Sequence, residues 1–215
     1  MKTFYSFLII VCLSGALRAQ VELSASMGIN FINSPSLYDY LNQNFPTPGE
    51  TTEGFNSSVI FLGGAGYNIS QSYQPAIEIG YLIYSYTSSG TNGQYEMSYG
   101  NFLISLLNYY VIAGEGYNFK FGGGLGIRFL SADQSLPGTG ITETFSSTGY
   151  GSSVRAEGNT LLGGNIYAKI GAQAGYDFNG EPENDGVPIF NNASDENVNF
   201  NSLSVGVSLG VSYIF

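Results

Sequence analysis

The side chains of this chain that could do chemistry are carboxylates, ammonium groups and guanidinium groups. The sequence has 16 acidic and 6 basic residues, no histidine, and a single cysteine, Cys12. General acid and base catalysis most often uses histidine, and covalent catalysis needs an activated nucleophile such as cysteine. No two carboxylates stand out as a coupled acid and base. We therefore predict no catalytic residue, no cofactor and no enzyme activity.

Seven charged side chains recur at polar positions of segments in which apolar and polar residues alternate. By phase they point away from the apolar face, and they are Glu22, Glu78, Glu96, Lys120, Arg128, Arg155 and Lys169. We expect Glu96 to lie beside Arg128 near one end of the strands. Glu22 and Glu78 are expected to lie with Lys120 and Arg155 near the opposite end. An unpaired charge in a narrow, poorly hydrated interior costs several kcal/mol. The sequence therefore predicts a plug of salt bridges, with a path for ions or small solutes as the alternative.

An acidic segment near the C-terminus, "NGEPENDGVPIFNNASDENVN", has a faint likeness to a calcium-binding loop. Glu181, Glu183 and Asp185 stand at alternate positions, as the first ligands of such a loop do. Pro182 interrupts the pattern, and Asn192 stands where a bidentate glutamate is needed. The sequence therefore predicts a solvated loop and no metal site.

The first residues have the features of a secretory signal peptide. A short basic start is followed by an apolar run at 4–13 and by small residues up to Ala19. The run is too short to span a bilayer as a helix, which needs about 20 residues. We predict a cleaved leader of residues 1–19 and one mature domain of residues 20–215, with cleavage after Ala16 as the alternative.

Removal of this leader leaves a strongly acidic chain. It takes away two of the six basic residues, so that four remain against 16 acidic ones, a formal charge of −12. Binding to nucleic acid needs clustered lysine and arginine, so we expect no nucleic-acid partner. Because Cys12 lies in the leader, disulfide bonds are excluded from the mature chain.

Alternation of apolar and polar residues dominates the rest of the chain and predicts eight β-strands. The expected strands are 21–31, 57–69, 77–86, 94–112, 118–130, 144–155, 162–178 and 201–215. Odd positions of 94–112 are expected to face outward, and 156–160 to form a tight turn. Connections after strands one, five and seven are long, that after strand three (87–93) is moderate, and those after two, four and six are very short. This alternation is typical of up-and-down membrane barrels.

The first long connection contains a candidate helix within "NSPSLYDYLNQNFPTP". Ser34 is a suitable N-cap and Pro35 suits the first helical position. Leu37, Leu41 and Phe45 repeat on one face, and the next proline ends the pattern. We expect a short amphipathic helix that covers the barrel mouth or rests against the outer leaflet.

The charge content distinguishes a barrel in a membrane from one in water. A water-facing surface carries roughly a quarter of its residues as Lys, Arg, Asp and Glu, whereas this chain has 10%. The polar faces offer mainly Ser, Gly and Asn, which suit a narrow lumen. Tyrosines expected at the membrane interfaces are Tyr67, Tyr84, Tyr86, Tyr95, Tyr99, Tyr109, Tyr110, Tyr117, Tyr176 and Tyr213. A Tyr-rich sandwich core or a secreted soluble β-barrel that binds a ligand is the alternative.

Three segments carry a family resemblance: "FLISLLNYYV", "YNFKFGGGLGIRFL" and the closing "SLSVGVSLGVSYIF". With the eight alternating strands and the leader, they resemble the small outer-membrane β-barrel proteins of Gram-negative bacteria, the OmpA/OmpW-like barrel superfamily. The resemblance implies an outer-membrane location, a monomer, and lipid as the surrounding partner. In that family the barrel assembly machinery recognises a last strand that ends in an aromatic residue, which implies that Tyr213 and Phe215 are the assembly signal.

The sequence thus favours an all-β, eight-stranded antiparallel transmembrane barrel with a plugged lumen. Its expected role is envelope integrity or surface interaction through its loops. The alternative implied by the OmpW-like relatives is a channel or transporter for a small solute, hydrophobic ones included. Ile60, Leu62 and Leu82 point inward by phase and would line an apolar path.

Overall fold

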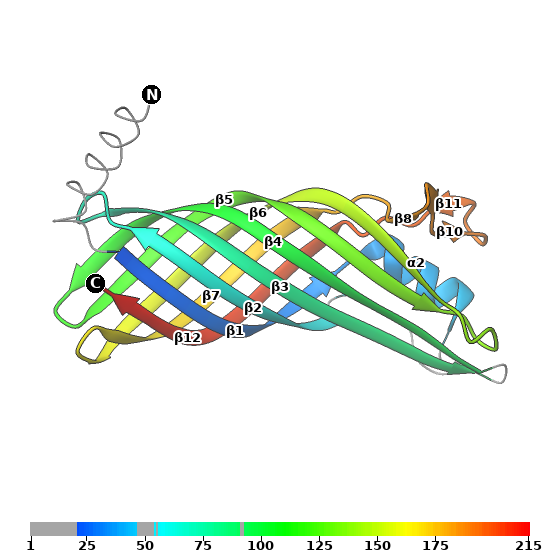
Figure 1. The fold of residues 1–215 in the computed structure, drawn as a ribbon, viewed down its shortest axis with the longest axis horizontal. Helices are drawn as coiled ribbons and strands as arrows, with labels where there is room; N and C mark the ends of the chain where they lie inside the picture. Colours follow the sequence, from blue (N-terminus) through cyan, green and yellow to red (C-terminus); the bar gives the residue numbers. More distant parts are fainter. Residues whose placement is uncertain (1–20, 47–53, 55, 91–92) are drawn as a thin grey trace, which may run out of the picture.

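In the computed structural model of the chain, the described residues are 21–46, 54, 56–90 and 93–215. The expected leader and its cleavage site lie outside these residues. Eight long antiparallel strands of the described part close into a ring, in the order β5-β4-β3-β2-β1-β12-β7-β6, with β6 paired back to β5 (Figure 1). The strands are β1 (Val21–Asn33), β2 (Asn56–Tyr67), β3 (Tyr73–Gly90), β4 (Gly93–Gly114), β5 (Tyr117–Ser135), β6 (Thr142–Gly163), β7 (Ile166–Phe178) and β12 (Ser202–Ile214).

Closure of the ring joins the two ends of the described chain. β1 pairs with β12 from Glu22 opposite Ile214 to Asn33 opposite Leu203, and the Phe215 amide donates to the Val21 carbonyl at 2.9 Å. A closed barrel leaves no strand edge unpaired, which is the condition for strands to lie in lipid. The predicted eight-stranded up-and-down barrel is confirmed.

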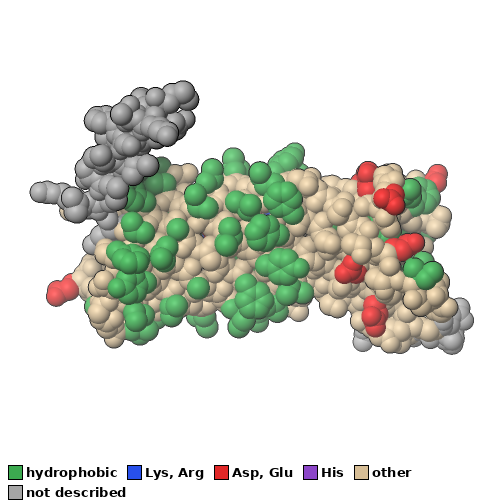
Figure 2. Space-filling model, in the orientation of Figure 1, with side chains coloured by type: hydrophobic (Ala, Val, Ile, Leu, Met, Phe, Trp, Pro, Cys, Tyr) green, Lys and Arg blue, Asp and Glu red, His purple; other side chains and the backbone are tan. Residues whose placement is uncertain are grey.

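Apolar side chains form a belt around the outside of this barrel, and Figure 2 shows the part of this belt on one face. The predicted outward faces of β1, β5, β7 and β12 are confirmed, with alternate side chains exposed along each strand. Leu125 and Leu209 are 71% and 67% exposed. Water-soluble proteins rarely expose apolar patches larger than a few hundred Å². The belt therefore fits contact with lipid.

The strands differ in length, and this difference shapes one end of the molecule. β1, β2, β7 and β12 have 12 or 13 residues, close to the roughly 9–11 that a tilted strand needs to cross a bilayer. β3, β4, β5 and β6 have 18 to 22 residues and continue past them as a curved four-stranded extension (Figure 1). We call this end of the barrel the loop end, and the opposite end, which carries both termini of the described chain, the turn end.

A helix, α2 (Pro35–Asn44), fills the loop end as predicted for the first connection. Pro35 occupies the first turn, but the Ser34 hydroxyl makes no cap hydrogen bond and donates instead to the Asn201 carbonyl at 3.1 Å. The helix buries Leu37 and Leu41 completely. It covers the barrel mouth, which is one of the two positions expected for it.

The segment between β7 and β12 packs against this helix. It contains the short strands β8 (Glu183–Asn184), β9 (Val187–Pro188), β10 (Phe190–Asn191) and β11 (Glu196–Asn197). The prediction of a solvated loop at 179–199 is wrong for its inner side, because Ile189 and Val198 are buried, as is Phe200 directly after it. These side chains, α2 and the inward side chains of the extension form one apolar core.

The predicted orientation of the fourth strand is wrong. The odd positions Tyr95, Met97, Tyr99, Leu103, Leu107, Tyr109 and Val111 are buried inside, and the even positions Phe102, Ile104, Leu106, Tyr110 and Ile112 are exposed outside. β4 is apolar on both faces because the inner side chains of its first half, from Tyr95 to Leu103, meet the apolar core at the loop end. Those of its second half, Leu107, Tyr109 and Val111, form a smaller separate cluster. Tyr95, Tyr99 and Tyr109 of β4 are accordingly interior residues and not interfacial ones. On β3, Tyr84 is also interior and Tyr86 is half-buried.

Two predicted connections are also wrong. Residues 156–160 lie within β6, and the chain turns only at Gly164, whose φ of +57° favours glycine. Residues 87–90 belong to β3, and Gly93 already belongs to β4. In both places small and polar residues that resemble a turn are strand residues, and Glu157 and Asn159 among them face the lumen.

Candidate functional site

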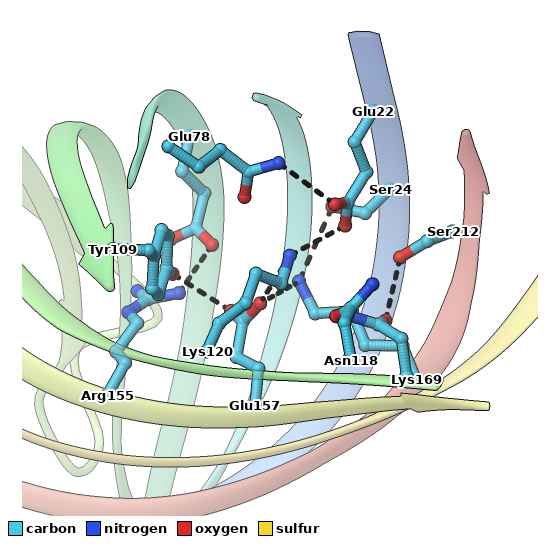
Figure 3. A network of polar contacts seen from close by, with 12 residues as sticks. Glu22, Ser24, Glu78, Tyr109, Asn118, Lys120, Arg155, Glu157, Lys169 and Ser212 are labelled. Atoms are coloured by element: carbon cyan, nitrogen blue, oxygen red, sulfur yellow. Dashed lines mark hydrogen bonds and ion pairs between the residues drawn. The ribbon is translucent and has the colours of Figure 1, made fainter. Parts of the chain in front are cut away.

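A network of charged side chains crosses the lumen in the half of the barrel near the turn end (Figure 3). Glu157 of β6 lies at the centre of the network, because its Oε2 atom forms ion pairs with two ammonium groups. Lys120 Nζ on β5 is 3.2 Å away and Lys169 Nζ on β7 is 3.1 Å away. Lys120 also contacts Glu22 Oε1 of β1 at 2.7 Å. Strands that are distant in the ring are thus bridged through the lumen.

Neutral groups add hydrogen bonds to this cluster. The Tyr109 hydroxyl donates to Glu157 Oε1 at 2.9 Å, and the Gln74 amide donates to Glu22 Oε2 at 3.1 Å. Lys120 Nζ lies 5.4 Å from the centre of the Tyr109 ring, within the range of a cation–π contact. Buried charges are tolerated when such partners satisfy their remaining donors and acceptors.

A separate pair joins β6 to β3 in the same half of the barrel. The Arg155 guanidinium binds the Glu78 carboxylate, and both side chains are nearly buried. Side chains two residues apart in a strand lie on the same face. Arg155 and Glu157 of β6 therefore both point into the lumen.

A further pair lies toward the loop end. Arg128 Nε of β5 contacts Asp177 Oδ1 of β7 at 2.6 Å, and Arg128 Nη1 donates to Ser105 Oγ at 3.2 Å. Gly151 on the intervening strand β6 makes room for this contact. A Cβ at Gly151 would overlap Asp177 Oδ1 and would lie only 2.6 Å from Arg128 Nη2. The pair therefore depends on glycine at this position.

These contacts balance the charges of the lumen. Every basic residue after position 18 takes part, and four carboxylates oppose the four cations. A cavity lined by Glu22, Lys120, Glu157 and Lys169 has a volume of about 20 Å³, which is room for about one water molecule. Beyond it, the apolar core with α2 occupies the lumen at the loop end. Ile60, Leu62 and Leu82 face inward by phase as expected, and belong to that core.

The structure brings together six of the seven charged residues expected in the lumen. The expectation for Glu96 is wrong, because β4 has the opposite orientation. Glu96 is exposed on the outer face, where its Oε1 accepts from the Gln94 amide at 2.8 Å. Its place beside Arg128 is taken by Asp177.

Sequence reasoning missed Glu157 and Asp177. Asp177 shares the inward phase of Lys169 on the predicted strand, so the alternation of that strand could have identified it. Glu157 was hidden by the expected turn at 156–160. Glu157 lies two residues after Arg155, and this spacing could have placed its side chain on the same inward face of the strand.

Two tyrosines of α2 anchor the helix over the lumen. The Tyr38 hydroxyl donates to the Ile32 carbonyl at 2.6 Å, and the Tyr40 hydroxyl accepts from the Gln134 amide at 2.5 Å. Burial raises the pKa of both hydroxyls above the ordinary tyrosine value. Both are therefore neutral hydrogen-bonding groups at physiological pH.

Among the described residues, no group of three or more His, Cys, Asp or Glu side chains is arranged to hold a metal ion. No helix of the described chain is long and apolar enough to cross a membrane.

Comparison with known proteins gives structural matches. No protein-family model and no curated protein sequence matches the chain. Neisserial surface protein A has a TM-score of 0.54 and 15% identity, over 91% of this chain and 97% of that one. Ail, the attachment invasion locus protein of Yersinia pestis, has a TM-score of 0.55 and 12% identity, over 93% of this chain and 100% of that one. A second structure of Ail contains the heparin analogue sucrose octasulfate.

A major outer membrane protein of Thermus thermophilus is similar as well. Its TM-score is 0.54, with 14% identity over 91% of this chain and 99% of that one. The closed ring, the outward apolar belt and these matches define the class. The chain has the fold of a small outer-membrane β-barrel protein.

Proposed function

We propose that this chain is a closed, monomeric barrel of the outer membrane that acts through its loop end at the cell surface. The observation that carries the proposal is the double closure of the lumen. A neutral network of ion pairs leaves room for about one water molecule, and the core around α2 fills the mouth. In a barrel closed in this way, the surfaces that a partner can reach outside the membrane lie at its two ends.

The orientation of the barrel follows from the connections. Small outer-membrane barrels have short turns on the periplasmic side and longer loops outside. α2 and β8 to β11 would then lie outside the cell, and the termini of the mature chain in the periplasm. The apolar belt supports lipid as the surrounding partner and speaks against a secreted soluble barrel.

Export and assembly complete the proposal. Residues 1–19 are removed during export, and the barrel assembly machinery recognises β12. In support, the Tyr213 and Phe215 side chains are exposed on the outer face, with ring centres 4.7 Å apart. An aromatic pair at the turn end is well placed both to anchor the barrel at the interface and to be recognised before insertion.

The role is proposed to be structural or adhesive and not catalytic. The chain contains no histidine, and the four lumenal carboxylates described above are each paired with a cation. A polyanion such as the sulfated ligand of Ail is a poor partner for this loop end, because all four basic residues of the mature chain are lumenal. The inward residues Ile60, Leu62 and Leu82 are covered by the apolar core, which speaks against a solute path through the mouth.

Cysteine labelling on intact cells tests the location and the orientation. The mature chain lacks cysteine, so Ser194→Cys at the loop end and Ser70→Cys at the turn end introduce single thiols at exposed serines. A membrane-impermeant maleimide should label Ser194→Cys on intact cells, and Ser70→Cys only after the outer membrane is permeabilised. Labelling of both or of neither on intact cells contradicts the proposal.

A further inference from the structure

A pocket of about 520 Å³ opens at the loop end, outside the plugged lumen. It lies between the C-terminal part of α2, the ends of β5 and β6 that meet there, and the β8–β9 hairpin. Tyr40, Phe45, Phe145 and Phe190 form aromatic walls, and Glu143 and Asp185 supply carboxylates. Its volume falls within the roughly 300–1,000 Å³ that is common for ligand pockets.

The inner wall of this pocket is preformed. Tyr40 and Phe145 are buried in the apolar core. The Phe45 ring stacks on Tyr95 with centres 3.7 Å apart and meets Tyr40 edge to face at 5.6 Å. Phe190, in contrast, leaves 44% of its side chain exposed at the rim. A preformed aromatic floor beneath an accessible ring lowers the entropy that the pocket's own side chains lose when a ligand binds.

The exposed charged side chains around the pocket are all acidic. The two lining carboxylates belong to the exposed acidic side chains of the loop end, where Figure 2 shows acidic groups on the visible face. The other described members are Asp39, Glu96, Asp133, Glu181, Glu183, Asp195 and Glu196. No Lys or Arg among the described residues lies at this end, because all four are in the lumen. A cation that enters the pocket meets carboxylates and aromatic faces and no competing cation.

We propose that this pocket binds a basic peptide segment, with an arginine or lysine side chain inserted between the aromatic walls. Cations are attracted to aromatic faces and to carboxylates. A peptide with several basic residues also complements the acidic groups around the pocket, which a small amine would leave unused. The inference rests on the proposed function, since it requires the loop end to face outside the cell.

Fluorescence anisotropy with the purified full chain in zwitterionic detergent micelles tests this inference. The probe is a labelled short peptide of arginine and glycine with one central phenylalanine, and empty micelles give the background. Glu143→Gln with Asp185→Asn should weaken binding about tenfold. Phe190→Ala should weaken it several-fold and tests the aromatic wall.

The matched control also removes two carboxylate charges, but at positions outside the pocket. Asp195 and Glu196 lie on the same segment as Asp185, between β7 and β12. The double variant Asp195→Asn with Glu196→Gln should weaken binding less than about threefold. Asp185 and Asp195 both have positive φ, of 51° and 60°, which asparagine tolerates, so both pairs should fold. A heat-modifiability gel checks that each variant is a folded barrel.

The inference would be overturned by no binding above empty micelles, by equal losses in the two charge pairs, or by equal binding of a peptide with glutamate for arginine. Preference for a neutral oligosaccharide over the basic peptide would overturn it as well. If the peptide fails to bind while Ser194→Cys is labelled on intact cells, the pocket assignment fails and the proposed function stands. If Ser194→Cys is not labelled, the proposed function itself fails.

Discussion

Glu157 is the residue on which the lumen network depends most, and its replacement by glutamine gives the sharpest prediction. Gln is nearly the same size but carries no charge. Lys120 would keep Glu22 at 2.7 Å, whereas Lys169 would keep only the Ser24 hydroxyl at 3.4 Å. Leaving a buried charge without its partner costs about 3–5 kcal/mol. Glu157→Gln should therefore lower the free energy of unfolding by that amount.

Urea unfolding of the refolded barrel in lipid vesicles, followed by the heat-modifiability shift, measures this change. Glu115→Gln, at an exposed position of the β4–β5 turn, is the matched control and should change stability by less than about 0.5 kcal/mol. Adding Lys169→Met to Glu157→Gln should restore at least half of the loss, because the unpaired ammonium group is removed. A stability of Glu157→Gln equal to that of the control, or no recovery in the double variant, would refute the reasoning.

Four further predictions concern other parts of the molecule. Leu37→Ala, at a fully buried position of α2, should cost about 2–5 kcal/mol and make the loop end sensitive to protease while the barrel band persists on gels. Val207→Lys, near the middle of β12 on its outer face, should cost about 2–4 kcal/mol. Ile141→Lys, similarly exposed but at the loop end, should cost less than about 0.5 kcal/mol in the same urea assay. Above pH 10 the unfolded chain loses the Tyr40 proton while the folded chain retains it, so protease resistance of the loop end should fall as pH rises, and Tyr40→Phe should reduce this loss. Deletion of Phe215 should reduce insertion into the outer membrane of cells more than it reduces the stability of barrels refolded in detergent; normal insertion would contradict the proposal that Phe215 is an assembly signal.

Alternation along the strands was sufficient to predict the barrel. β1 and β12 carry apolar residues on one face and mainly Ser, Gly or Asn on the other, so period, closure and outward face all follow from the residues. The inward positions of Lys120, Arg128 and Lys169 follow from the same alternation.

Other features depend on contacts between distant segments. β4 is apolar on both faces, so its phase is decided by α2 and the segment after β7, which meet its inner face. Glu157 lies in a stretch whose small and polar residues suit a turn and a narrow lumen equally well. The pairing of Arg128 with Asp177 depends on the register across β6 and on the space left by Gly151, which no local pattern reveals.

The closed lumen is the central claim, and single-channel recording of the purified, folded protein in a planar lipid bilayer tests it most directly. Ion pairs that leave a cavity of about 20 Å³, beneath a mouth filled by the apolar core, predict a membrane current that stays at the baseline. Long-lived openings of large, uniform conductance would contradict the account.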